Sequence, residues 1–432
     1  MFEVREKPQM VERALLVSVY FNRRDADTAE SLLLELEELV KTLGIEVIER
    51  LLVFSRQQHR KLICGTGKAA ELAELAAAHE CDVIVFDNEM LPSQQREWEE
   101  LSDLCVIDRE EVILDIFARR AQTREATLQV DLARMQYALP RMARMWAHLD
   151  REGGSGGGQG GGGAARGMGE KQIEVDRRLA RTKIDSIKRE LEKVRSQRAT
   201  QRKDRERFET PTAAIVGYTN AGKSTLLNKL SGSEVMSKDM LFATLDTTTR
   251  RIELPDGQPL LLTDTVGFIR NLPHRLIEAF KATLEEAVIA DFLIHVLDAT
   301  SPEIAEHHDT TLAVLAELGA GDKRMIILLN KADQVEDPAR ITELRHRFPD
   351  AIPTSALTGQ GMETLRQRCS AMMADRVRRA SYRIPQRRAD LVGLLHRDAK
   401  VLSTDYEGND VLVTAVVPAA LAGRLGEFVI EE

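Results

Sequence analysis

The segment Gly217-Tyr-Thr-Asn-Ala-Gly222-Lys223-Ser224 has the residue types and spacing of a phosphate-binding loop. It follows a short apolar run and precedes a predicted helix, which is the context that the pattern GxxxxGK[ST] requires. Glycines let backbone N–H groups turn toward phosphates, and the amino end of the helix adds positive potential. In this pattern the lysine reaches the β- and γ-phosphates, and the hydroxyl of the next residue ligates Mg²⁺. The candidate phosphate-binding residues are Gly217, Tyr218, Thr219, Asn220, Ala221, Gly222, Lys223 and Ser224.

A second motif, Asp264-Thr265-Val266-Gly267, follows the apolar run Pro259–Leu262. At the end of a strand, Asp264 is expected to hold Mg²⁺, largely through water, while the Gly267 N–H senses the γ-phosphate. The next residue is Phe268, which cannot orient an attacking water as a glutamine does. We therefore expect hydrolysis to be slow until a partner or an ion completes the site.

Asn220 suggests which ion that is. It is the fourth residue of the phosphate-binding loop, and related GTPases with asparagine there can use K⁺ in place of an arginine finger. K⁺ is therefore a candidate cofactor besides Mg²⁺. Equal hydrolysis rates in K⁺ and in Na⁺ would exclude it.

A third motif, Asn330-Lys331-Ala332-Asp333, ends the apolar run Met325–Leu329. The Asp333 carboxylate can accept hydrogen bonds from the N1–H and 2-amino groups of guanine, and adenine lacks both donors. Leaving such a carboxylate unpaired costs about 1–3 kcal/mol, which favours GTP over ATP. Ser355-Ala356-Leu357 follows at the spacing where the Ala356 N–H can reach guanine O6. The sequence thus predicts a site for GTP and GDP.

Between the first two motifs lies a threonine-rich segment, Phe242–Arg251. A loop that responds to the γ-phosphate needs one hydroxyl that ligates Mg²⁺ and later lets go. We favour Thr244, although Thr247, Thr248 and Thr249 remain open, and threonines are also ordinary strand formers. The nucleotide-binding residues expected in this loop are Phe242, Ala243, Thr244, Leu245 and Asp246, and the expected catalytic residues are Lys223, Thr244 and Gly267.

The elements that position these motifs belong to an α/β chain of several domains. Apolar runs alternate with helical patterns over residues 13–117, which predicts an N-terminal α/β domain with a largely parallel sheet. The predicted strands are Ala14–Phe21, Val47–Phe54, Asp82–Phe86 and Leu104–Ile107. A small α+β domain is expected at the C-terminus. The predicted boundaries are 1–125, 126–209, 210–375 for the P-loop GTPase domain, and 376–432.

Residues 126–209 carry two helical seams around a glycine cluster. One seam runs from Leu128 to Leu149 and the other from Ala180 to Val194, both spaced alternately by four and three residues. Between them, residues 153–169 hold 11 of the 27 glycines. The matched seams predict an antiparallel helical hairpin with a glycine-rich tip, whereas composition alone favours a flexible linker between domains.

Charge is uneven along the chain. The whole sequence of 432 residues has a net charge of −9, but residues 170–209 hold 14 Lys and Arg against 9 Asp and Glu. Such a helix face is usually only solvated, yet it also suits the phosphate backbone of RNA. No apolar run approaches the roughly 18 residues of a membrane helix, and the charged N-terminus is unlike a signal peptide. We expect a cytoplasmic monomer without DNA as a partner.

These motifs resemble those of the HflX-type ribosome-associated GTPases. The resemblance rests on GYTNAGKST, FATLDTTTRR and DTVGFIRNLPHRLIEAFKATLEE, and on VIDREEVILDIFARRAQTREATLQVDLARMQYALPRM and GEKQIEVDRR around the glycine cluster. It runs from about Ala14 to the end of the GTPase domain. This chain departs from the family pattern GGxGxRGPGETQLExDRR, because Met168 replaces the proline, Lys171 replaces the threonine, and the loop is longer.

The resemblance implies a function. Members bind the large ribosomal subunit and its rRNA through the N-terminal domain and hairpin, and in the GTP-bound form they separate stalled or idle ribosomes. It also implies that Thr244 ligates Mg²⁺, and that GTP hydrolysis is slow alone and stimulated by ribosomal subunits. Two alternatives remain: a GTPase that assembles the large subunit, and a regulatory switch with a protein partner.

Overall fold

The computed structural model describes residues 11–152, 175, 177–194, 196, 210–232, 241–242, 244–273, 276, 284–373 and 377–430. The chain divides into two compact units. The first comprises Met1–Val194, Met240–Phe242 and Arg270–Phe280, and the second Arg195–Asp239, Ala243–Ile269 and Lys281–Glu432. The predicted glycine-rich tip, residues 153–169, lies outside the described residues.

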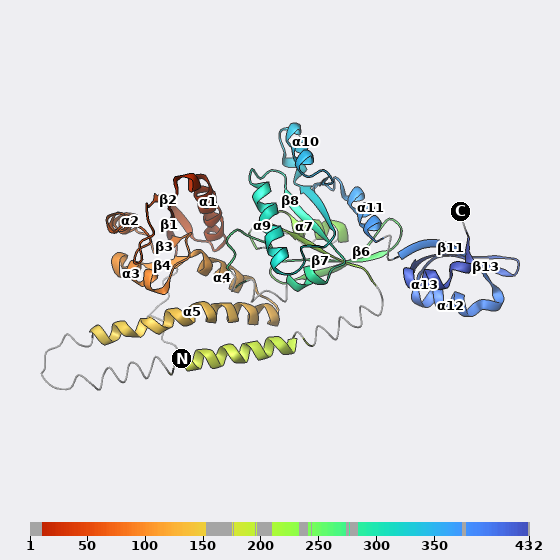
Figure 1. Ribbon diagram of the computed structural model, residues 1–432, viewed down its shortest axis with the longest axis horizontal. Helices are drawn as coiled ribbons and strands as arrows, with labels where there is room; N and C mark the ends of the chain where they lie inside the picture. The colour runs from red at the N-terminus through yellow and green to blue at the C-terminus, as the bar shows by residue number, and fades with distance from the viewer. Residues whose placement is uncertain are drawn as a thin grey trace. The chain divides into compact units, whose positions relative to one another are not determined.

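The first unit contains a parallel sheet of four strands in the order β2-β1-β3-β4 (Figure 1). The strands are β1 (Arg13–Tyr20), β2 (Glu46–Phe54), β3 (Val83–Phe86) and β4 (Cys105–Asp108). The connecting helices are α1 (Ala26–Thr42), α2 (Thr66–Ala78), α3 (Pro92–Ser102) and α4 (Arg109–Arg120). Buried side chains such as Leu15, Phe86 and Trp98 form its core. The predicted N-terminal α/β domain is confirmed, and the strand order, which the sequence did not reveal, is new.

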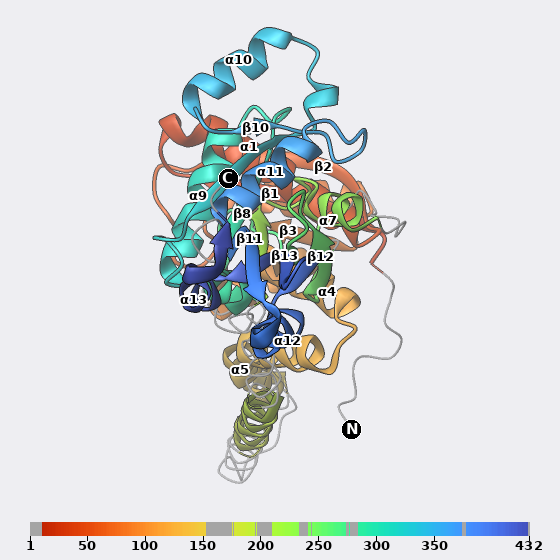
Figure 2. The same cartoon turned by 90° about the vertical axis from the view of Figure 1, so that its right-hand side faces the viewer.

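The two helical seams meet in this unit. Helix α5 (Arg124–Glu152) and the helical residues 177–194 lie side by side in both ribbon views (Figures 1 and 2). Their buried contact is formed by Leu132, Ile184, Ile187 and Leu191, with Leu128, Met135 and Leu139 at its margin. Arg124 Nη2 donates to Glu190 Oε2 at 2.9 Å. The seam pattern therefore buries one apolar stripe of each helix on the other.

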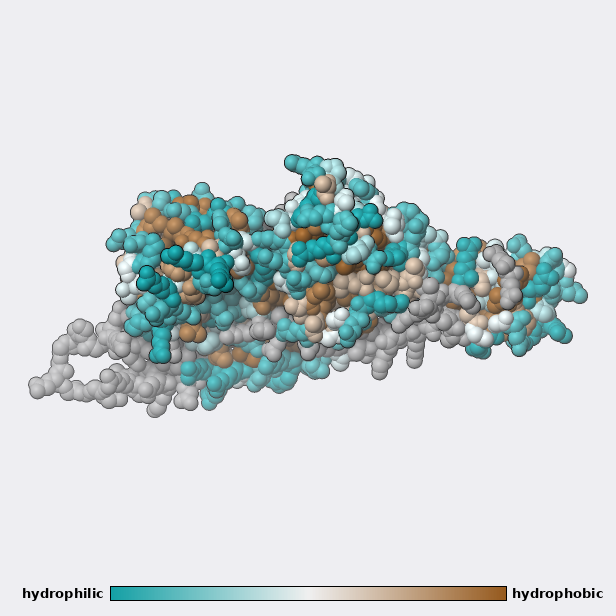
Figure 3. All heavy atoms as spheres, turned by 45° about the horizontal axis from the view of Figure 1, so that its top comes forward, coloured by the Kyte–Doolittle hydropathy of each residue, from teal (hydrophilic) through white to brown (hydrophobic). Residues whose placement is uncertain are grey.

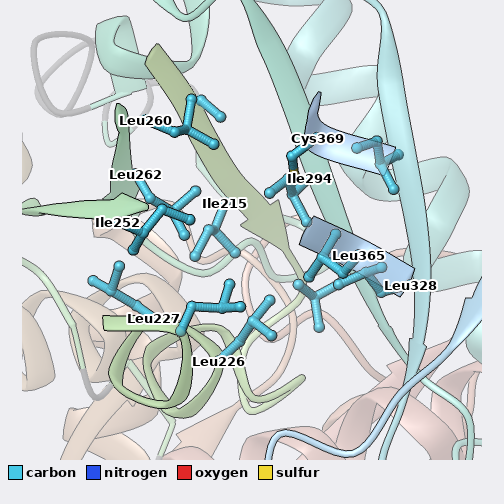
Figure 4. Packing of buried hydrophobic residues seen from close by; sticks show 14 of the residues in the cluster. Ile215, Leu226, Leu227, Ile252, Leu260, Leu262, Ile294, Leu328, Leu365 and Cys369 are labelled. Atoms are coloured by element: carbon cyan, nitrogen blue, oxygen red, sulfur yellow. The ribbon is translucent and has the colours of Figure 1, made fainter. Parts of the chain in front are cut away.

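The second unit holds a sheet of six strands in the order β10-β9-β8-β5-β7-β6. Only β6 (Thr248–Glu253) is antiparallel to its neighbour, β7 (Pro259–Asp264). The other strands are β5 (Thr212–Gly217), β8 (Phe292–Asp298), β9 (Met325–Asn330) and β10 (Ile352–Pro353), and the helices are α7 (Lys223–Ser231), α9 (Ile304–Glu317), α10 (Pro338–Arg347) and α11 (Met362–Met372). Figure 4 shows Ile215, Leu226 and Leu262 converging in the core beside this sheet. The carboxyl ends of β5, β7 and β9 carry the three sequence motifs, so the sheet brings them to one edge.

The C-terminal residues form an antiparallel sheet with the order β12-β13-β11-β14. Its strands are β11 (Val377–Pro385), β12 (Lys400–Glu407), β13 (Asp410–Pro418) and β14 (Val429–Ile430), with α12 (Ala389–Asp398) and α13 (Ala419–Arg424) between them. This confirms the predicted α+β domain.

The visible surface mixes hydrophilic side chains with separate hydrophobic patches (Figure 3). In the part of the chain that the structure describes, no helix is long and apolar enough to cross a membrane.

Candidate nucleotide-binding site

The phosphate-binding loop begins where β5 lies too close to its neighbouring strand β8 for a side chain to fit between them. Gly217 has φ +149°, and a Cβ there would lie 2.3 Å from the Val296 carbonyl oxygen. At the other end of the loop, Gly222 has φ +93°, and a Cβ there would lie 2.3 Å from Asn330 Nδ2. At both positions φ is positive and there is no room for a Cβ atom, so only glycine fits. The loop spacing is therefore required by the fold as well as by the ligand.

Lys223 begins α7 and is buried, with its Nζ donating to the Tyr218 carbonyl at 2.7 Å. Burial lowers the pKa of its ammonium group to about 8, and the nearby Asp264 carboxylate opposes this shift. The Lys223 ammonium group therefore lies beside the backbone of the predicted phosphate-binding loop.

Three oxygen-bearing side chains meet next to this lysine. Ser224 Oγ lies 2.6 Å from Thr244 Oγ1 and donates to Asp264 Oδ2 at 2.6 Å. Asp264 is buried, and its Oδ1 has no hydrogen-bond partner among the described residues. Burial raises the pKa of this carboxyl, while Lys223 and the two hydroxyls oppose the change. Two hydroxyls and an unsatisfied carboxylate oxygen form the hard-oxygen donor set that Mg²⁺ prefers, so these residues fit the ion.

The second motif is held against the loop by its backbone. Thr219 N donates to the Phe268 carbonyl at 2.8 Å, and Phe268 N donates to the Gly217 carbonyl at 3.1 Å. A Cβ on Gly267 would lie 2.9 Å from Lys223 Nζ. The Phe268 ring is fully buried, so no side chain stands at this position in the place of a water-orienting glutamine. Thr265 is buried with its Oγ1 donating to the Ile215 carbonyl at 2.7 Å, and Val266 is buried too.

The third motif is joined to the first by one amide side chain. Asn330 Nδ2 donates to the Ala221 carbonyl at 2.8 Å, and Asn330 Oδ1 accepts from Ala356 N at 3.0 Å. Lys331 Nζ pairs with Asp298 Oδ2 at 2.8 Å. Asn330 therefore links three predicted site segments.

The remaining residues of that motif lie around this link. Asp333 lies in an exposed turn formed with Ala332. Ser355 is buried and its Oγ accepts from Thr358 N at 3.0 Å, whereas Leu357 is exposed. The carboxylate predicted to read guanine is therefore accessible to a ligand.

The threonine-rich segment separates into parts with different surroundings. Thr244 joins the oxygen cluster, whereas Thr248 and Thr249 belong to β6, and Thr249 Oγ1 lies 2.9 Å from Thr263 Oγ1. Of the hydroxyls left open by the sequence, the Thr244 hydroxyl is the one that contacts Ser224 among the described residues.

The other residues expected in this loop do not share one environment. Phe242 is buried in the first unit, its ring edge-on to Phe117 of α4 with centroids 4.6 Å apart. Leu245 is buried, Asp246 is partly exposed, and Ala243 lies outside the described residues. The structure thus brings Thr244 to the phosphate-binding loop and gives Phe242 an aromatic partner in the first unit.

One neighbour of the loop was missed by the sequence analysis. The Tyr218 ring stacks on His307 of α9, with centroids 3.8 Å apart and planes at 10°. His307 Nε2 lies 3.6 Å from Glu303 Oε2. No local sequence pattern predicts this contact, because the two rings belong to separate segments of the chain. In the sequence, His307 cannot be told from a histidine on the exposed face of a helix.

Comparison with known proteins gives matches along the chain. Three family models match: "GTP-binding GTPase N-terminal" at residues 30–118, "GTP-binding GTPase Middle Region" at 120–205, and "50S ribosome-binding GTPase" at 212–331. The chain is 63% identical over 433 residues to the GTPase HflX of Akkermansia muciniphila, covering 99% of both chains. It is 41% identical over 375 residues to the GTPase HflX of Escherichia coli, covering 87% of this chain and 86% of that protein.

Proposed function

The chain belongs to the HflX family of GTPases, and from that premise we propose that it binds the large ribosomal subunit with GTP and splits stalled or idle ribosomes. Its hydrolysis of GTP follows from the family, whose GTPase domain is of the ribosome-binding class. GTP binding would drive engagement with the subunit, and hydrolysis would drive release. What we propose beyond the family assignment is the binding partner, the large subunit, and the substrate, a stalled or idle ribosome.

One observation carries the ribosome part of the proposal: the second hairpin helix presents a basic face. Residues 177–194 hold seven Lys and Arg against three Asp and Glu, and all seven cations are exposed. The apolar seam of the same helix is buried against α5. Because the apolar side packs on α5, the exposed Lys and Arg side chains lie on the outward side, where they can contact the phosphate backbone of rRNA.

The site residues have separate tasks in this proposal. Lys223 binds the β- and γ-phosphates, the Gly267 N–H faces the γ-phosphate, and Asp333 selects guanine. Ser224, Thr244 and Asp264 would hold Mg²⁺, the last through water, and the bound ion would neutralise phosphate charge. Asn220 is a candidate ligand for K⁺, which makes faster hydrolysis in K⁺ than in Na⁺ the expected result.

Hydrolysis by the free protein should be slow. The buried Phe268 ring cannot orient water, so another group must complete the site, and we propose that a ribosomal subunit does so. GTPase activity measured with and without purified large subunits tests this directly. An equal rate in both reactions would contradict the proposed stimulation.

Two sedimentation experiments test the proposed target. The protein should co-sediment with purified large subunits in the presence of a non-hydrolysable GTP analogue and much less with GDP. Incubation with intact ribosomes and GTP should then release free subunits. Co-sedimentation without subunit release would favour a role in assembly, and no nucleotide-dependent co-sedimentation would favour a regulatory switch with a protein partner.

A further inference from the structure

Both loops that are expected to contact the γ-phosphate are continuous with residues of the first unit. Phe242 lies just before Thr244, the expected Mg²⁺ ligand, and Arg270 lies just after Gly267, whose N–H is expected to face the γ-phosphate. By their contacts, Phe242 and Arg270 belong to the first unit, whereas Thr244 and Gly267 belong to the second. Each loop therefore has a neighbouring residue that is held by the N-terminal α/β domain.

Phe242 is held by an aromatic contact. Its ring lies edge-on to the ring of Phe117 in α4, with centroids 4.6 Å apart and planes at 75°, and both side chains are buried. Phe242 also has φ +52°, a left-handed backbone conformation that is costly for a bulky residue. Such a conformation persists only where the surroundings hold it, and the buried ring pair supplies that hold here. The backbone beside Thr244 is therefore fixed from α4.

Arg270 is held by polar contacts with α1. Its side chain is buried, with Nη2 donating to Ser31 Oγ at 2.7 Å and Nε lying 3.7 Å from Glu35 Oε2. Glu35 Oε2 also accepts from Arg109, so this carboxylate pairs with two cations inside the first unit. Separating a buried guanidinium from its carboxylate is costly, because both charges would be left without a partner. The chain that follows Gly267 is therefore fixed from α1.

We propose that two contacts, Phe117 with Phe242 and Glu35 with Arg270, position the two γ-phosphate loops and thereby select GTP over GDP. The Thr244 hydroxyl already lies in the oxygen cluster that fits Mg²⁺. A loop that is held in this arrangement loses less conformational entropy when GTP binds than a loop without such a contact. GDP has no γ-phosphate for these loops to contact, so the two anchors raise the affinity for GTP alone. This inference rests on the site roles in the proposed function and adds the residues that place those groups.

The test compares the dissociation constants of a non-hydrolysable GTP analogue and of GDP, measured with Mg²⁺ on the full-length protein by isothermal titration. F117L removes the ring and should weaken binding of the analogue by about 2- to 10-fold, the range expected for one aromatic pair, with GDP affinity unchanged. R270M removes the guanidinium and should weaken analogue binding by about 10-fold or more, again with GDP affinity unchanged. In GTP hydrolysis, KM should rise in both variants while kcat stays nearly constant, because bound GTP still orders the loops.

The matched controls remove side chains of the same kind elsewhere in the first unit. F86L changes a buried phenylalanine that packs on Trp98 with ring centroids 4.9 Å apart, and R141M removes a largely buried arginine of α5. Both controls should lower stability and leave the ratio of the two dissociation constants unchanged. Two results would overturn the positioning role: equal losses of analogue and GDP affinity in F117L and R270M, or a ratio that does not differ from that of the controls.

T244A tests the proposed site role separately from the anchors. It should lower the preference for the GTP analogue, because it removes the hydroxyl that we propose ligates Mg²⁺. If T244A lowers this preference and F117L and R270M do not, the anchors fail and the site role stands. If T244A leaves the preference unchanged while R270M lowers it, the role of Thr244 fails, and the anchor beside Gly267 stands.

Discussion

The parallel sheet of the first unit and the largely parallel sheet of the second unit differ at the carboxyl ends of their strands. In the second unit, the strand ends lead into glycines whose backbone leaves no room for a side chain, as at Gly217 and Gly222. In the first unit, the ends of β3 and β4 are filled by ionised side chains. Arg109 pairs with Glu35 and Asp87, and Arg141 pairs with Asp108. In the second unit, exposed backbone at the strand ends forms an anion site. In the first unit, ion pairs between side chains fill the ends of β3 and β4 and form a structural joint.

That joint attaches the helical hairpin to the sheet. Asp108 is the last residue of β4 and is buried, and it accepts from Tyr137 Oη at 3.0 Å and from Arg141 Nη2 at 3.1 Å. Arg141 also donates to the Met90 carbonyl at 3.1 Å and to Gln95 Oε1 at 2.9 Å. Tyr137 and Arg141 both belong to α5. The predicted RNA-binding arm is thus anchored by charge at the position where the other sheet would bind a ligand.

The largest effect should come from removing the cation of the anion site. Lys223→Ala should reduce GTP affinity by at least about 100-fold, because it removes the cation that we propose binds the β- and γ-phosphates. Isothermal titration with GTP measures this. Arg345→Ala, which removes an exposed cation from α10 of the same unit, is the matched control. An unchanged affinity in the Lys223 variant would contradict the phosphate-binding role and remove one side of the comparison.

Base selection at the same edge should respond to a change of one atom. Asp333→Asn replaces an acceptor by a donor, so the variant should lose about 100-fold in GTP preference and gain affinity for xanthine nucleotides, which carry a carbonyl in place of the 2-amino group. Competition between GTP and XTP measures the exchange. A variant that still selects GTP would show that the guanine is recognised elsewhere.

A substitution at the ion-paired edge should change the stability of the first unit and leave GTP binding unchanged. Arg141→Met leaves the buried Asp108 carboxylate without its cation and should lower the unfolding free energy of the first unit by about 3 kcal/mol. Trp98, in the core of that unit, reports unfolding by fluorescence in a W146F background. D108N/R141M removes both charges and should recover part of the loss, whereas GTP affinity should stay unchanged in both variants. A double variant as unstable as the single one would argue against the ion pair.

These two edges also show why the sequence predicted one and not the other. The phosphate-binding loop is contiguous and its glycines have fixed spacing, so a short pattern determines the geometry. The joint combines Glu35, Asp87, Arg109 and Arg141, which come from α1, from the residue after β3, from α4 and from α5, and each one alone looks like an ordinary surface charge. The helical seams were predictable because periodicity is local, whereas the strand order and the stack of Tyr218 on His307 depend on long-range packing that no single segment encodes.

A smaller effect should appear as a pH dependence of the joint. Tyr137 Oη lies 3.1 Å from Glu111 Oε2, and burial together with the Asp108 charge raises the pKa of Glu111 to about 7. Because this pKa is raised on folding, the contribution to stability is fully present below about pH 4.5 and is lost as the pH rises through about 7. The stability of the wild type relative to Glu111→Gln should therefore be lower at pH 8 than at pH 5, with the fall confined to pH values below about 7 and no steeper than about 1.4 kcal/mol per pH unit. Denaturation curves at both pH values measure this, and parallel changes in the two proteins would contradict it.

The smallest expected effect is at the phosphate-binding loop. It tests whether the geometry of the loop depends on its neighbour His307. His307 stacks on Tyr218, whose carbonyl accepts from Lys223, so the ring supports the loop from α9. His307→Ala should weaken GTP binding by about 3- to 10-fold, the value of one aromatic stack. His307→Phe keeps the flat face and should restore binding, with kcat changing less than the affinity in both variants. If phenylalanine and alanine are equally weak, the histidine acts through its nitrogen atoms. If both bind GTP like the wild type, the loop is held by its backbone alone, and the contrast with the charge-anchored edge becomes sharper.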